Sequence, residues 1–126
     1  MSYMGILHTE VSISALNSPD DRHTLDNVMV DTGSEYNWLP SDLLIDMGIV
    51  PVRVDRFETA DGRIIDREVG FAMMYAAGRS SPTVVVFAHP GDKTLLGAIG
   101  LEGMNLCVDL TRWELVPAGP VVAAAA

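Results

Sequence analysis

Hydrophobic and polar residues alternate over several short stretches of the chain, a pattern that predicts half-buried β-strands. Residues 10–15 and 52–55 alternate in this way, and residues 69–75 place apolar or aromatic side chains on one face at every second position. Residues 83–87 are almost continuously apolar, which is typical of a strand buried on both sides. Asp61-Gly62 lies between two of these stretches and predicts a tight hairpin turn, because this dipeptide readily adopts positive φ angles.

Two segments predict short helices. In residues 40–48, Ser41 suits the N-cap position and Gly48 suits the C′ position that ends a helix. The second helix is expected within residues 98–104, directly after a brief apolar strand that ends in Gly97. At least six strand candidates against two short helices predict an all-β domain, with its strands closed into a barrel.

Turns are expected where Gly, Pro, Asn and Asp gather, at residues 17–21, Gly78–Pro82 and 89–92. Near the end of the chain, two apolar stretches flank Thr111-Arg112 and predict a final hairpin. We find no internal repeat and no interdomain linker. Residues 1–117 are therefore predicted to form one domain, and residues 118–126, which end in four alanines, a tail without chemistry of its own.

The charge balance narrows the range of partners. Among 126 residues, 8 are basic and 17 are acidic, so the formal net charge is −9. This excess of negative charge disfavours binding to nucleic acid or to an anionic membrane surface. No apolar run approaches the roughly 20 residues that span a bilayer, and residues 1–5 lack the basic-then-apolar pattern of a secretory signal. We therefore expect a cytoplasmic protein.

The use of cysteine also agrees with a cytoplasmic location. Cys107 is the one cysteine, which excludes an intramolecular disulfide framework and a metal site built from several thiols. Its neighbours Leu106 and Val108 are apolar, so a buried, unreactive thiol is expected. The three histidines are scattered without ligand spacing, and we expect neither a metal nor another cofactor.

The segment that packing explains least is an apolar run that stops abruptly at a carboxylate. Residues 28–30 are Val-Met-Val, and Asp31-Thr32-Gly33-Ser34 follows directly. Asp-Thr-Gly alone is common in turns. Here, however, Leu39-Pro40 and a predicted helix follow it, and Leu95-Leu96-Gly97 stands well downstream.

This combination resembles the aspartic proteases of the retropepsin type, in particular their small single-domain cellular members, over roughly residues 5–117. The resemblance implies a closed acid-protease barrel with one lobe per chain. It places a mobile flap at Ala60, Asp61 and Gly62, and it packs the loop of Leu96 and Gly97 against the active site. Residues 101–109 also look like those of the cellular members.

The resemblance implies a catalytic role for Asp31, supported by Thr32, Gly33 and Ser34. Two carboxyls that share one proton can act as general base and general acid towards a water and a peptide bond. Because this chain holds one Asp-Thr-Gly, the resemblance requires a homodimer in which each copy gives one Asp31. In such a dimer Thr32 is expected to form a hydrogen bond across the interface, and Gly33 to let the backbone approach the pair.

Two neighbouring residues have alternative interpretations. The Ser34 hydroxyl could donate a hydrogen bond to the ionised Asp31 carboxylate, which would lower the pKa values of the pair. Alternatively, Ser34 simply continues the loop with its hydroxyl turned away from Asp31. Glu35 is either a contact for substrate or a solvated loop residue.

The leading function is therefore an aspartic endopeptidase that acts on peptides or proteins as a homodimer. One alternative is a non-catalytic dimeric module that binds peptides or serves as a scaffold with the same fold. Another is a protease subunit that needs a different partner chain. Peptide cleavage separates the first two possibilities, and the mass of the purified protein tests the third.

Overall fold

A computed structural model describes residues 6–125, and Met1–Gly5 and Ala126 lie outside the described residues. The elements, in chain order, are β1 (His8–Ser14), β2 (His23–Val30), β3 (Asn37–Pro40), α1 (Ser41–Asp46), β4 (Arg53–Glu58), β5 (Ile64–Ala76), β6 (Arg79–Ala88), β7 (Leu95–Leu96), α2 (Ala98–Met104), β8 (Leu106–Asp109) and β9 (Glu114–Pro117). The all-β prediction is confirmed, and both predicted helices are present.

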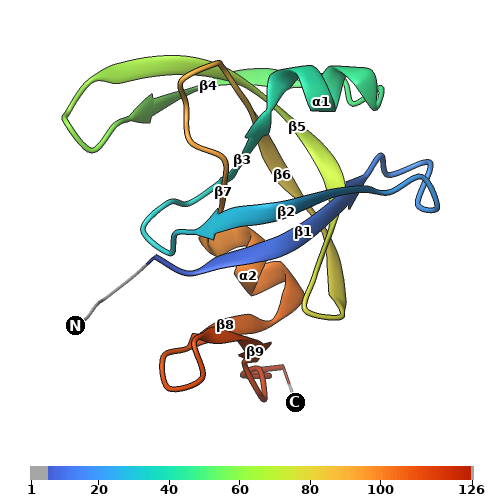
Figure 1. Cartoon of the computed structure of the whole chain (residues 1–126), viewed down its shortest axis with the longest axis vertical. Coiled ribbons are helices and arrows are strands. Elements are labelled where there is room, and N and C mark those ends of the chain that lie inside the picture. The colour runs from blue at the N-terminus through green and yellow to red at the C-terminus, as the bar shows by residue number, and fades with distance from the viewer. Residues whose placement is uncertain (1–5, 126) are drawn as a thin grey trace.

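The main sheet closes on itself. Its seven strands run in the order β1-β2-β7-β3-β6-β5-β4, and β1 also pairs with β5. Six strands therefore form a ring, while β4 extends beyond it as the outer partner of β5. Figure 1 shows the β4–β5 hairpin reaching out at the top of the molecule and the separate β8–β9 hairpin at the bottom, with α2 between that hairpin and the barrel.

Two of the strand pairings are parallel, β2 with β7 and β3 with β6. The other pairings of the described strands are antiparallel. Strand β6 is contacted by both α1 and α2 in addition to its barrel neighbours, which explains why residues 85–87 are completely or almost completely buried, as their continuous apolar pattern predicts. The largest fully buried side chains fill the barrel: Phe87, Ile13, Leu39, Leu44, Met74, Leu96 and Met104.

The long strand β5 shows which of its faces meets the core. Ala72, Met74 and Ala76 are buried, whereas Phe71 in the alternating apolar set remains 42% exposed. Val69 is buried because this part of β5 pairs with the fully buried Val86 of β6. The alternation was therefore a correct signal for a strand, but most of the face with the larger side chains lies outside the core.

Two local predictions were wrong. Ser41 is the first helical residue of α1, and Pro40 occupies the N-cap without a side-chain hydrogen bond. The turn expected at Gly78–Pro82 is confined to Ala77-Gly78, because both residues have positive φ and reverse the chain in two residues. Pro82 consequently lies within β6, opposite Met73. Gly48 follows the helix with φ +78°, as expected.

The prediction for the single thiol was also wrong. Cys107 is exposed on β8, where it pairs with Val116 of β9. The β8–β9 hairpin is a separate two-stranded sheet, so one of its faces has no second layer within the described chain to cover it. The apolar neighbours Leu106 and Val108 belong to the other face of the strand, which packs towards the core. No helix within residues 6–125 is long and apolar enough to cross a membrane.

Candidate active site

Asp31 follows the last residue of β2, on a loop that neighbouring strands hold in place. Its backbone N–H donates to the carbonyl of Leu96 at 2.9 Å, which continues the parallel pairing of Val30 with Leu96. The Asp31 carbonyl accepts the Ser34 N–H at 3.1 Å and closes a turn. Gly33 N–H donates to the carboxylate oxygen Oδ1 of Asp31 at 2.9 Å. The loop thus orients the Asp31 carboxylate, and Asp31 remains partly exposed to solvent.

Leu96 and Gly97 lie directly against this loop. A Cβ atom on Gly97 would stand 2.2 Å from the carbonyl oxygen of Tyr36 and 2.7 Å from that of Ser34, so only glycine fits here. The next two residues, at the start of α2, donate their N–H groups to the carbonyls of Ser34 at 2.8 Å and Glu35 at 3.0 Å. The Asp31 loop and the β7–α2 junction therefore form one hydrogen-bonded unit.

Sequence reasoning missed the residue at the centre of this unit. Asn37 is fully buried, and its Oδ1 accepts the Gly97 N–H at 2.9 Å. Its Nδ2 donates to Thr83 Oγ1 at 3.0 Å and to the Val84 carbonyl at 2.9 Å. A single amide side chain thereby joins β3, β6 and the β7–α2 junction. The available signal was a single Asn at the start of the otherwise apolar stretch Trp38-Leu39-Pro40.

Thr32 lies at the outer edge of the loop, where it is exposed in the single chain. It borders an apolar groove of about 500 Å³ whose walls include Ile6, Leu110 and Trp113. Leu110 is 71% exposed and lies in this groove beside the 59% exposed Ile6 and the 38% exposed Trp113, so the groove is an exposed apolar patch. The groove joins the start of the chain, the Asp31 loop and the β8–β9 hairpin on one surface.

The expected hydrogen bond from Ser34 to Asp31 is absent from this structure. The Ser34 hydroxyl donates instead to the Tyr36 carbonyl at 3.0 Å. The alternative interpretation, in which the hydroxyl turns away from Asp31, therefore describes the single chain. The backbone N–H of Gly33 fills the donor role at the carboxylate that had been assigned to Ser34.

The predicted flap segment forms the turn between β4 and β5. Ala60, Asp61 and Gly62 occupy its tip, and Gly62 has φ +85°. The Thr59 hydroxyl, and then Arg63 at 3.1 Å, interact with the Asp61 carboxylate and hold its pKa below the usual range. These contacts satisfy Asp61 within the turn, which agrees with its expected role as a turn-former.

A cleft of about 680 Å³ separates the arm of this hairpin from the Asp31 loop. One wall is formed by residues 33–36 and Trp38, and the other by residues 55–58 of β4. Phe57 reaches across and packs edge-on against Tyr36 and Trp38, with ring centroids 5.6 and 4.9 Å apart. The volume falls in the usual range of small-ligand sites. Glu35 is exposed and lines this cleft.

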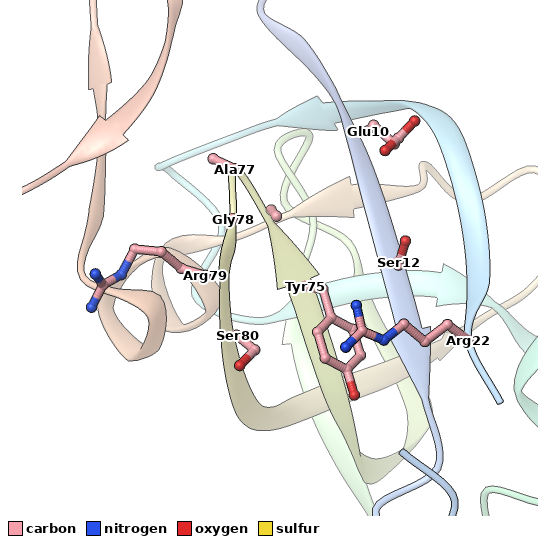
Figure 2. A pocket seen from close by; sticks show the side chains of 9 residues that line it. Glu10, Ser12, Arg22, Tyr75, Ala77, Gly78, Arg79 and Ser80 are labelled. Carbon is pink, nitrogen blue, oxygen red and sulfur yellow. The ribbon is translucent and has the colours of Figure 1, made fainter. Parts of the chain in front are cut away.

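A second, polar pocket of about 310 Å³ lies between β1 and the β5–β6 turn (Figure 2). The Arg22 guanidinium stacks over the Tyr75 ring, 3.7 Å from its centroid. Arg79 lies on the opposite side of the pocket in Figure 2 and donates to the Met104 carbonyl. The two guanidinium groups do not converge, so we do not assign a ligand to this pocket.

The remaining acidic and metal-ligating residues have structural surroundings. Asp109 accepts the backbone N–H groups of Thr111 at 2.9 Å and Arg112 at 3.1 Å, which stabilises the turn of the last hairpin. Within residues 6–125, no group of three or more His, Cys, Asp or Glu side chains is placed to hold a metal ion.

Comparisons with known proteins support the fold. No family model and no curated protein matches the sequence. Among solved structures, the chain is similar to a protein described as the protease of Simian Foamy Virus (mac), with a TM-score of 0.52 and 20% sequence identity. The match covers 75% of this chain and 91% of the viral one. The chain thus has the all-β, retropepsin-like fold of that viral protease.

Proposed function

We propose that this chain is a small, single-domain aspartic endopeptidase of the retropepsin type that acts as a homodimer. The observation that carries the proposal is the position of Asp31. In a retropepsin-like fold, it follows β2 on a loop locked to the β7–α2 junction, with its carboxylate oriented by the Gly33 N–H. Residues 33–36 of the same loop line the cleft, and general acid–base chemistry requires a carboxylate held in a fixed position close to such a binding site.

The proposed mechanism uses one Asp31 from each copy. Two carboxyls held close together cannot both ionise easily, so the pair keeps one proton. The ionised carboxylate takes a proton from a water molecule, which attacks the carbonyl carbon of the peptide bond. The protonated carboxyl donates its proton to the departing amine as the carbon–nitrogen bond breaks. Gly33 N–H engages one oxygen of Asp31 and leaves the other available for the shared proton.

The requirement for a second copy is supported by the surface around Thr32. Thr32, the apolar groove beside it and the exposed Leu110 lie next to the Asp31 loop, where a twofold axis would have to pass. Burial of this groove against a second copy would remove apolar surface from water. It would also bring Thr32 close enough for the hydrogen bond expected across the interface.

The test is digestion of a peptide library at several pH values by the intact protein and by Asp31→Asn. Asparagine is nearly isosteric but cannot act as general base, so cleavage should fall by about a thousandfold or more. Asp26→Asn, at an exposed position of β2, is the matched control and should cleave normally. Substantial activity in Asp31→Asn would contradict the catalytic role. Peptide binding without cleavage by the intact protein would favour the non-catalytic module.

Sedimentation tests the dimer directly. The intact protein should sediment near twice 13.6 kDa. Thr32→Ala should weaken association, because a buried hydrogen bond is lost at two symmetric positions, each costing about 1–3 kcal/mol. Cleavage by a strict monomer that depends on Asp31 would contradict the homodimer.

A further inference from the structure

The cleft beside Asp31 has an uneven distribution of charge. Three carboxylates line it, Glu35, Asp55 and Glu58, against the single guanidinium of Arg56. Asp55 is already neutralised by Arg53, whose Nε lies 3.0 Å from its Oδ1. Arg56 in turn is paired with Asp66 on β5, at 3.4 Å. The local cations are therefore committed to other carboxylates.

Glu35 and Glu58 are the other two carboxylates that line the cleft. Within residues 6–125, neither carboxylate takes part in an ion pair. They come from the two different walls of the cleft, one from the Asp31 loop and one from the β4 arm. Both are exposed, so neither is prevented by packing from turning towards a bound ligand. Each wall of the cleft thus carries one carboxylate without an ion-pair partner among residues 6–125, whereas the guanidinium of Arg56 in its lining is already paired with Asp66.

The interior of the cleft is aromatic. Tyr36, Trp38 and Phe57 line the cleft, the first two are packed edge-on against Phe57, and all three are only half-buried, so part of each ring is open to a ligand. Aromatic ring faces attract a cation and also accept the methylene groups of a long side chain. The aromatic rings and the two carboxylates therefore favour the same occupant, a long aliphatic stem that ends in a positive charge.

We propose that this cleft binds a lysine or arginine side chain of the peptide substrate, with its stem against the aromatic rings and its charge near Glu35 and Glu58. The proposal rests on the proposed function, because it takes the cleft as a substrate subsite beside Asp31. A homodimer presents the cleft twice, once in each copy. A preference for cationic residues should therefore appear on both sides of the cleaved bond.

The experiment uses quenched fluorescent peptides in which one position at a time carries Lys, Arg, norleucine or Glu. Norleucine keeps an unbranched apolar stem and removes the charge. We expect kcat/KM to be about tenfold higher for Lys or Arg than for norleucine at the preferred positions. Higher salt should reduce this ratio, because exposed charges are screened.

Charge-removing variants assign the preference to residues. Glu35→Gln and Glu58→Gln should each lower the Lys-to-norleucine ratio by about three- to fivefold, and the double variant should bring it close to unity. Glu68→Gln is the matched control, since Glu68 is exposed on the same hairpin outside the cleft. That variant loses the same charge and should keep the ratio. An unchanged ratio in the double variant, or an equal loss in the control, would overturn the proposal.

Binding separates this proposal from the proposed function. The affinity of the Lys and norleucine peptides for the intact protein and for the double variant is measured by calorimetry, which does not depend on turnover. Binding that favours Lys and depends on Glu35 and Glu58, without any cleavage, would support the subsite and contradict the protease. Cleavage that favours norleucine or Glu would support the protease and contradict the subsite. If the intact protein neither binds nor cleaves the peptides, both are wrong.

Discussion

The Asp31 loop and the β4–β5 hairpin lie on either side of the same cleft, yet they are stabilised in different ways. The loop is held by parallel strand pairing, by the buried Asn37 and by two N–H groups at the start of α2. The hairpin arm β4 pairs with β5 alone. Ion pairs such as Arg63 with Asp61, at the tip of the hairpin, are exposed and contribute about 0–1 kcal/mol each. One less exposed pair, Arg67 with Asp92, joins β5 to the loop after β6.

This difference matches the tasks that we propose for the two regions. Acid–base chemistry needs a carboxylate fixed to within a fraction of an ångström, and a buried hydrogen-bond network provides that rigidity. A flap has to open for substrate and close over it, which requires an element with few buried contacts. The same comparison yields a series of substitutions whose effects on stability should fall from the loop to the flap tip.

Gly97→Ala should have the largest effect. The new methyl group would stand 2.2 Å from a backbone oxygen of Tyr36, and backbone cannot move aside as a flexible side chain can. We expect the free energy of unfolding to fall by at least about 3 kcal/mol, as for severe overpacking. Urea unfolding at one fixed protein concentration measures it. A variant as stable as the intact protein would show that the loop is not rigidly packed.

Asn37→Ala should cause the second-largest loss in the free energy of unfolding. It leaves the Gly97 N–H and the Thr83 hydroxyl buried without this partner, at about 1–3 kcal/mol for each unsatisfied group. Asn27→Ala, at an exposed position of β2, is the matched control and should stay within about 0.5 kcal/mol. Hydrogen exchange at the Gly97 amide should accelerate in Asn37→Ala alone. Equal effects of the two substitutions would show that the hydrogen bonds of Asn37 do not stabilise the Asp31 loop.

The results for these residues show what the sequence could and could not predict. The end of a strand directly before Asp31, the Asp61-Gly62 turn and helix α2 were predictable because each depends on neighbouring residues or on a local apolar pattern. The role of Asn37 was not predictable, because its three partners come from β6 and the β7–α2 junction, far along the chain. The prediction of a buried Cys107 was wrong for a related reason: the flanking apolar residues lie on one face of the strand and carry no information on the other face.

The orientation of Ser34 was also beyond local reasoning. Its hydroxyl has two acceptors within reach of the loop, the Asp31 carboxylate and the Tyr36 carbonyl, and the observed partner is Tyr36. The choice depends on how the backbone of residues 34–36 is anchored to Gly97 and α2. Closure of the barrel was predictable as an architecture, whereas the pairing of β1 with β5 that achieves it is a long-range feature.

The ion pair of Arg67 with Asp92 joins the hairpin to the barrel, and its loss should have an intermediate effect. It is bidentate, at 2.7 and 3.0 Å, and its side chains are only 14% and 17% exposed. Arg67, helped by the His89 N–H, lowers the pKa of Asp92 from its ordinary value of 3.8. The ionised pair therefore adds stability above pH 3.8, and this contribution disappears as the pH falls through the lowered folded-state pKa.

Asp92→Asn should lower the free energy of unfolding by about 2 kcal/mol at pH 7, because Arg67 keeps its charge in a half-buried position without a countercharge. The difference from the intact protein should shrink below pH 3.8. Glu114→Gln is the control, since its pair with Arg112 is exposed, lies at the separate β8–β9 hairpin and should contribute little at any pH. Urea titrations at pH 7 and pH 3 measure both. A pH-independent difference would attribute the effect of Asp92 to packing rather than charge.

Gly62→Ala at the flap tip should have the smallest effect, although it is the same change as Gly97→Ala. A Cβ on Gly62 meets no atom within 4 Å, so the positive φ of +85° is the one source of strain. The cost should be about 1 kcal/mol, and the hairpin can adjust its turn without disturbing the Asp31 loop. Hydrogen exchange should therefore accelerate at residues 59–63 while the Gly97 amide stays as protected as before. A loss as large as that of Gly97→Ala would mean that the hairpin tip is packed in the proposed homodimer and that the contrast between the two regions belongs to the single chain alone.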